Sequence, residues 1–282
     1  MQCVDIDQLT FSYDNIPFFQ DLSLQLSTNE CYVLSGLNGC GKSTLLKILG
    51  GKVLCTHDKV RIFGKDPFRD TSSNRDILFV NNEWGNRTVA YSGYDVPLQS
   101  SLQVKDMMVK LKETYPERNT ELLRVLGVNP EWHLNGVSEG QRKRVQLYLN
   151  LLHPFRLCLL DEITVNLDLL VKHRLMEYLK KETRERKCCI VYVTHIFDGL
   201  ESWATRLIYM RKDKGLEIHP MGEIDNMYRF LLTRFQKEES ATGDDGARNE
   251  EKEDKPLVIE LKNAGGYSHG VLGSCNVIEN SI

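Results

Sequence analysis

The stretch CYVLSGLNGCGKST, residues 31–44, decides the fold of this chain. Its first five residues form a compact apolar run typical of a buried strand, and residues 36–44 then fit the pattern G-x-x-x-x-G-K-[ST]. A helix is expected over 42–49, where two glycines end it. This order of strand, turn and helix binds phosphate, because glycines let backbone N–H groups curl around the oxygens and the helix N-terminus adds positive charge.

Phosphate chemistry gives the residues of this loop their expected roles. We expect Lys42 to reach the β- and γ-phosphates and the Ser43 hydroxyl to bind Mg²⁺. The other loop residues expected to bind nucleotide are Gly36, Asn38, Gly39, Cys40, Gly41 and Thr44. ATP and Mg²⁺ are therefore the predicted cofactors.

A second apolar run, residues 157–160, ends in two adjacent carboxylates, Asp161 and Glu162. A parallel sheet presents the ends of its strands at one rim, where ligands bind. We expect Asp161 to hold Mg²⁺ through water and Glu162 to position or activate the water that attacks the phosphate. Such a pair is often only a helix cap, but the phosphate loop upstream favours catalysis.

The segment VSEGQRKRV, residues 137–145, resembles the signature of the ATP-binding-cassette (ABC) ATPases, usually L-S-G-G-Q followed by a basic helix. Residues 165–168, VNLD, resemble the S-A-L-D segment of that family. His195, after an apolar strand, resembles the switch histidine that contacts the γ-phosphate, and Tyr13 resembles the aromatic residue that stacks on adenine.

The resemblance implies a site shared between two cassettes. Glu162, His195 and Lys42 would be catalytic. Residues expected to contact the ATP held by the opposite cassette are Ser138, Gly140, Gln141 and Asp168. The implied partner is a second ABC cassette, either a copy of this chain or a different one.

The expected fold class is α/β, since strand and helix patterns alternate as in a parallel sheet. The resemblance spans residues 2–222 and implies a P-loop NTPase cassette with an antiparallel β subdomain and a helical subdomain. The expected domains are a cassette over 1–236, with its helical subdomain at about 85–155, an acidic disordered linker over 237–256 and a weakly ordered tail over 257–282.

Periodicity places the main elements within these domains. Strands are expected at 4–11, 18–26, 60–63, 77–80 and 188–193. Helices are expected at 102–126, 138–152, 167–186 and 224–236. Residues 238–254 hold eight acidic and two basic residues with no large apolar side chain, which is typical of disorder.

Two positions depart from the family pattern. No glutamine follows the strand at 77–80; Asn82 is nearest to the expected position and is predicted to contact Mg²⁺ and nucleotide. Glu139 stands where the signature has its first glycine, and a carboxylate there should repel phosphate unless it points away. Four segments together resemble the soluble single-cassette ABC proteins of fungi and plants: residues 60–68 (VRIFGKDPF), 81–84, 137–146 and 160–170 (LDEITVNLDLL). The fungal member of that group is associated with a carbon-catabolite-repression complex.

Composition excludes several classes of protein. A net charge of −3 on 282 residues does not favour direct binding to nucleic acid. The N-terminus lacks a secretory pattern and no run of about eighteen apolar residues occurs, so we expect no membrane span. The eight cysteines include no C-x-x-C pair, and Cys158, Cys188 and Cys189, which lie in apolar runs, are expected to be reduced core residues. The expected location is cytoplasmic, with the nucleus as a second compartment.

Four functions remain open from these residues. The favoured one is a regulatory ATPase that dimerises around Mg-ATP within a soluble complex acting on transcription or mRNA. The alternative is the detached nucleotide-binding subunit of a membrane transporter. A translation factor ranks lower because such relatives carry two cassettes, and a non-hydrolysing sensor ranks lower because the hydrolytic residues are all present.

Overall fold

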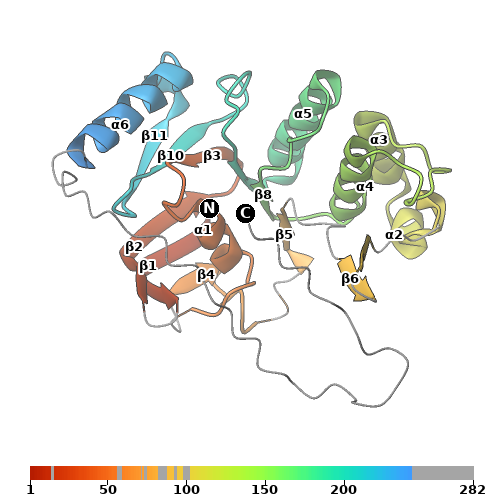
Figure 1. Ribbon diagram of the computed structural model, residues 1–282, viewed down its shortest axis with the longest axis horizontal. Helices are drawn as coiled ribbons and strands as arrows, with labels where there is room; N and C mark the ends of the chain where they lie inside the picture. The colour runs from red at the N-terminus through yellow and green to blue at the C-terminus, as the bar shows by residue number, and fades with distance from the viewer. Residues whose placement is uncertain are drawn as a thin grey trace, which may run out of the picture. The chain divides into compact units, whose positions relative to one another are not determined.

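The computed structural model describes residues 1–13, 16–55, 59–70, 72, 75–81, 88–91, 94–97 and 102–242. Its centre is a six-stranded sheet in the order β11-β10-β3-β9-β8-β5, in which every pairing except β10–β11 is parallel (Figure 1). These strands are β3 (Glu30–Gly36), β5 (Ile77–Val80), β8 (Leu157–Asp161), β9 (Cys189–Val193), β10 (Arg206–Met210) and β11 (Leu216–Pro220). The phosphate loop therefore follows a central strand.

A separate antiparallel sheet has the order β2-β1-β4. Its strands are β1 (Gln2–Tyr13), β2 (Ile16–Ser27) and β4 (Val60–Ile62), and it supplies the expected antiparallel β subdomain. A two-stranded hairpin of β6 (Thr88–Tyr91) and β7 (Tyr94–Pro97) was not expected from the sequence.

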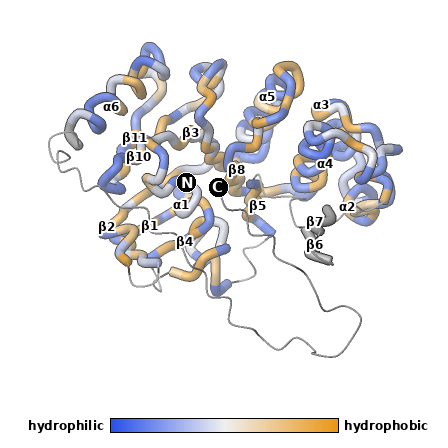
Figure 2. The backbone as a smooth tube through the Cα atoms, in the orientation of Figure 1, coloured by the Kyte–Doolittle hydropathy of each residue, from blue (hydrophilic) through white to orange (hydrophobic). Residues whose placement is uncertain are grey.

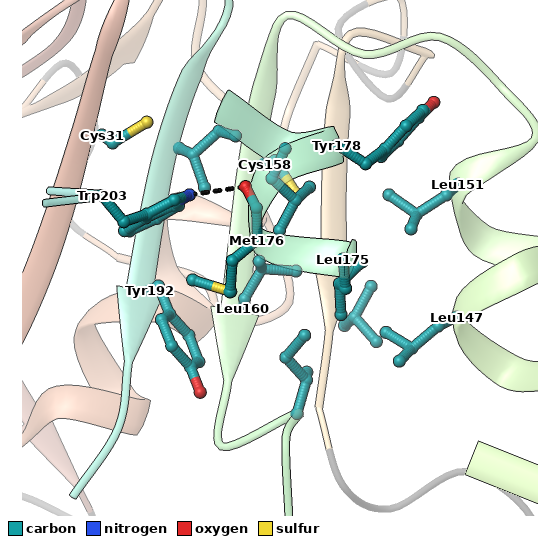
Figure 3. Close-up of a cluster of buried hydrophobic side chains, with 14 of the residues drawn as sticks. Cys31, Leu147, Leu151, Cys158, Leu160, Leu175, Met176, Tyr178, Tyr192 and Trp203 are labelled. Atoms are coloured by element: carbon teal, nitrogen blue, oxygen red, sulfur yellow. Dashed lines mark hydrogen bonds between the residues drawn. The ribbon is translucent and has the colours of Figure 1, made fainter. Parts of the chain in front are cut away.

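The central sheet separates two apolar cores because successive strand residues point to opposite faces. In β8, Cys158 and Leu160 face one core with the helices α3 (Pro116–Leu126), α4 (Glu139–Leu151) and α5 (Leu169–Arg186), whereas Leu157 and Leu159 face the other with α1 (Lys42–Leu49) and the antiparallel sheet. Strands buried on both faces read as continuous apolar runs. Trp203 extends the first core, where its indole donates to Met176 O at 2.9 Å (Figure 3).

Ahead of α3 the chain forms η2 (Val104–Asp106) and α2 (Val109–Thr114), and farther along the chain α6 (Met227–Thr242) adds Met227 and Leu231 to the first core. The prediction of one helix over 102–126 is wrong: Met108 adopts a left-handed conformation, with φ of 51°, and Pro116 starts a new helix. Figure 2 shows polar and apolar residues interleaved along α5, as expected for a helix that covers a sheet with one side.

The C-terminal helix α6 (Met227–Thr242) follows η3 (Met221–Glu223). The prediction that it ends at 236 is wrong, because the helix includes the first residues assigned to the acidic linker. The remaining linker and the tail, 243–282, lie outside the described residues, so those two domain assignments stay predictions. In the part of the chain that the structure covers, no helix is both long and apolar enough to cross a membrane.

Candidate nucleotide site

The phosphate loop has the backbone that its glycines predict. Gly41 has φ of 114°, and a Cβ there would lie 2.9 Å from ring carbons of Phe18 and Phe19. No other residue fits this conformation and this space without strain. The predicted helix α1 then begins at Lys42, and Asn38 and Gly39 of the preceding loop and Ser43 of the first turn are exposed. The helix N-terminus is therefore free to receive an anion.

Lys42 lies within this loop rather than in solvent. Its ammonium donates to the carbonyls of Gly36 at 2.8 Å and Leu37 at 3.0 Å, and its side chain is buried. A buried ammonium needs such partners. Phosphate oxygens are stronger acceptors than carbonyls for this charge, so the lysine is placed to exchange them for nucleotide.

The aromatic end of the site joins β1 to the phosphate loop. Tyr13 is 42% exposed, and its hydroxyl donates to Thr44 Oγ1 at 3.4 Å. Phe18 packs edge-on against Tyr13 with ring centroids 5.4 Å apart. An exposed aromatic face fixed beside the loop is suited to stack on a base.

Lys214, in the turn between β10 and β11, also touches the phosphate loop. Its ammonium donates to Gly39 O at 2.6 Å and lies 4.4 Å from the ring centroid of Phe18. The sequence patterns did not single out this residue, since the contact joins positions 175 residues apart. It adds a second cation to the loop besides Lys42.

Ser43 and Asp161 lie together at the rim of the sheet. Burial, helped by the neighbouring Glu162 charge, raises the pKa of Asp161 above its usual value, although a hydrogen bond from the Ser43 side chain acts in the opposite direction. One hydroxyl and one carboxylate suit Mg²⁺, which keeps most of its water and takes phosphate oxygens. Within the described ranges no group of three or more His, Cys, Asp or Glu could hold a metal ion.

Glu162 and His195 form the predicted catalytic pair. Their Oε1 and Nε2 atoms lie 3.2 Å apart, and both side chains are about two-fifths exposed. Glu162 has φ of 50°, an uncommon conformation for a residue other than glycine, and its N–H donates to Val193 O at 3.0 Å. Burial, helped by the charge of Lys42, lowers the pKa of His195, although the Glu162 carboxylate acts in the opposite direction.

The signature residues form a second group on α4 and α5. Ser138 caps α4: its Oγ accepts from Gln141 N at 3.3 Å, and the Gln141 side chain accepts from Ser138 N at 2.9 Å. Asp168 caps α5 through Val171 N and pairs with Arg144 of α4. In Figure 1, α4 and α1 lie on opposite sides of β5. The two groups of predicted residues therefore come from different parts of the cassette.

The end of β5 is hydrogen-bonded to α4. Asn81 O accepts from Gln146 Nε2 at 2.9 Å and from Lys143 Nζ at 3.2 Å, both on α4. Burial lowers the pKa of Lys143 to about 8, against the effect of the Asp161 carboxylate. Asn82, the predicted Mg²⁺ contact, lies outside the described residues, so its role stays a prediction.

Comparisons with known proteins assign the family. A family model described as ABC transporter matches residues 19–165, about half of the chain. The chain belongs to the ABC transporter family. ABC transporter I family member 20 of Arabidopsis thaliana is 40% identical over 242 residues, which are 82% of this chain and 74% of the plant protein. CCR4-associated factor 16 of Saccharomyces cerevisiae is 37% identical over 220 residues, or 75% and 76% of the two chains.

Solved structures confirm the fold of this ABC protein. An ATP-binding subunit of an ABC transporter has a TM-score of 0.67 at 18% identity and covers 85% of this chain and 98% of that subunit. A dimeric bacterial ABC transporter cassette has a TM-score of 0.62 at 24% identity, covering 77% and 98%. The family resemblance and the α/β fold predicted from the sequence are thus confirmed, and the chain is an ATPase of the ABC type.

Proposed function

We propose that this ABC ATPase forms a closed dimer around Mg-ATP and that soluble regulatory proteins bind the closed form. The observation that carries the proposal is the separation of the two groups. Lys42, Ser43 and Asp161, which would hold one side of a nucleotide, lie around the phosphate loop, whereas Ser138 caps an exposed helix end elsewhere. An exposed helix N-terminus binds anions, and a second cassette would supply the phosphate that this one binds.

Four apolar side chains in the segments that follow β8 and β9 are exposed. Leu169, the first residue of α5, is 82% exposed, and its neighbour Leu170 is 55% exposed. Val165 and Ile196, which follow the catalytic strands β8 and β9, are 37% and 44% exposed. Exposed apolar side chains can mark surfaces that bind another protein, and these follow Glu162 and His195 in the chain. They support a cassette partner that covers the site.

The proposed roles follow from this arrangement. Lys42 binds the β- and γ-phosphates, Tyr13 stacks on adenine, and Ser43 with Asp161 would hold Mg²⁺, which would neutralise phosphate charge when bound. Glu162 accepts a proton from the attacking water or orients it, and His195 donates a hydrogen bond toward the γ-phosphate. The predicted contributions of Ser138, Gly140, Gln141 and Asp168 reach the ATP of the second cassette.

The regulatory part of the proposal depends on similarity to CCR4-associated factor 16, which the chain matches over three quarters of its length. We propose that the chain works in the cytoplasm or nucleus with a soluble complex. The second candidate is the nucleotide-binding subunit of a membrane transporter, favoured by the dimeric bacterial transporter cassette that shares this fold.

Turnover as a function of protein concentration tests the shared site. We expect the specific activity to rise with protein concentration and to saturate as dimers form. A specific activity that is constant while the protein stays monomeric would contradict the proposal. A second experiment separates the two candidate functions. Glu162→Gln protein is purified with Mg-ATP from cytosolic and from membrane fractions, and Lys42→Ala serves as the control without bound nucleotide. An ATP-dependent partner in the cytosolic fraction supports the regulatory function, and one in the membrane fraction supports the transporter subunit.

A further inference from the structure

Glu139 places a carboxylate at the first position of α4, where the signature pattern has glycine. An exposed carboxylate beside a helix N-terminus competes with any phosphate that approaches the same N–H groups. The structure gives this carboxylate a definite partner: Asn166 Nδ2 donates to Glu139 Oε1 at 2.7 Å. Asn166 itself stands where the S-A-L-D pattern has alanine, so the side chains at two departures from the pattern meet each other.

The backbones at this contact are also close. A Cβ on Gly140 would lie 2.9 Å from Asn166 O, so residue 140 has no room for a side chain. Asn166 has φ of 69°, a left-handed conformation that asparagine tolerates better than most residues. Loop and helix therefore meet through a backbone approach and a side-chain hydrogen bond at the same place.

A second bridge lies one turn along α4. Arg144 pairs with Asp168, which caps α5 through Val171 N. This bridge holds the far end of the loop independently of Glu139. Loss of the Asn166 amide would consequently free the Glu139 carboxylate without detaching the loop from α4.

We propose that Glu139 and Asn166 are a matched pair of positioning residues. The Asn166 amide holds the carboxylate against the loop before α5 and away from the phosphate that the N-terminus of α4 meets in the partner cassette. This inference depends on the proposed ATP-driven dimer, and it concerns dimer affinity rather than nucleotide binding within one chain. The Glu139 carboxylate does not repel the partner's phosphate while the Asn166 amide restrains it.

A double-mutant cycle tests the pair. In a Glu162→Gln parent with saturating Mg-ATP, the dimer dissociation constant is measured by analytical ultracentrifugation. We expect Asn166→Ala to weaken the dimer about three- to tenfold, because a released charge then faces phosphate, and Asn166→Asp to weaken it further, because two carboxylates face each other. Glu139→Gln keeps an acceptor for the amide and removes the charge, so adding it should abolish the effect of Asn166→Ala.

Two controls separate a positioning role from a loss of structure. ATP affinity of each variant below the dimerisation range should stay within about twofold of the parent, since Lys42 and Tyr13 are untouched. Glu121→Gln, which removes an exposed ion pair with Lys181 between α3 and α5, should leave dimer affinity unchanged. In hydrolysis-competent protein, Asn166→Ala should lower turnover at low protein concentration and approach the parent rate at high concentration.

The outcomes distinguish the inference from the proposed function. Weakening by Asn166→Ala that disappears with Glu139→Gln supports the matched pair. The same loss with and without Glu139→Gln, or no loss at all, overturns the pair while the dimer stands. A parent that stays monomeric with Mg-ATP overturns both.

Discussion

Glu182→Gln should destabilise the cassette through a single buried charge. Arg118 of α3 and Glu182 of α5 are each 5% exposed, and their Nη1 and Oε2 atoms lie 2.5 Å apart. Arg118 Nε also donates to Leu151 O, the last residue of α4, at 2.6 Å. One guanidinium therefore joins α3, α4 and α5. Ser138 caps α4 and Asp168 caps α5, so the same helices carry predicted site residues.

The magnitude follows from burial. Removing one partner of a buried ion pair leaves the other charge without compensation and costs about 3–5 kcal/mol. Among the residues that the structure describes, Arg118 Nη2 has no hydrogen-bond partner, so no second carboxylate or carbonyl there would compensate for the loss of Glu182. The matched control is Glu121→Gln on the same two helices: its pair with Lys181 is 27% and 45% exposed, so its loss should cost about 0–1 kcal/mol.

Urea unfolding followed by far-ultraviolet circular dichroism measures the difference. With a denaturant slope of about 3 kcal/mol per molar, Glu182→Gln should lower the midpoint by about 1–1.7 M, and Glu121→Gln by about 0.3 M or less. Equal midpoints for the two variants would refute the reasoning that burial sets the cost. Arg118→Met with Glu182→Leu, which removes both charges, should recover most of the loss.

Three further predictions concern the site. Glu162→Gln should lower turnover about 10²–10⁴-fold while ATP still binds, because the group that activates water is lost; full activity would exclude that role. Lys214→Met should weaken ATP binding about three- to tenfold through the phosphate loop, whereas Lys212→Met should not, and equal affinities measured by calorimetry would contradict this. The His195 pKa, followed by NMR, should lie below 6.5. It should fall further in Glu162→Gln, because this variant loses the carboxylate that favours the protonated imidazole. Turnover should then decline only as pH falls through that lowered value, and a His195 pKa above 6.5 would be inconsistent with the geometry.

Local patterns predicted the parts of the fold that depend on neighbouring residues. The strand, glycine turn and helix around Lys42 are confirmed, because glycine positions and an apolar run specify them without distant partners. The cap of α4 by Ser138 is confirmed for the same reason. The break of the predicted helix at Met108 was missed, since apolar spacing continues through it while the backbone turns.

Contacts between distant segments could not be predicted from spacing. The approach of Lys214 to Gly39 depends on how β10 and β11 lie beside β3, and the bond from Asn166 to Glu139 depends on how α5 starts beside α4. The sequence predicts that the Glu139 carboxylate repels phosphate unless its side chain points away from it. The structure supplies the partner that holds it there.

The most direct test of the account is the mass of Glu162→Gln protein in solution with and without Mg-ATP. The account predicts a chain of 32.5 kDa without nucleotide and a pair of chains with it, because each phosphate site needs the signature helix of another cassette. A protein that binds ATP and remains a single chain at every concentration tested would contradict the claim that this ATPase completes its site with a second copy of itself.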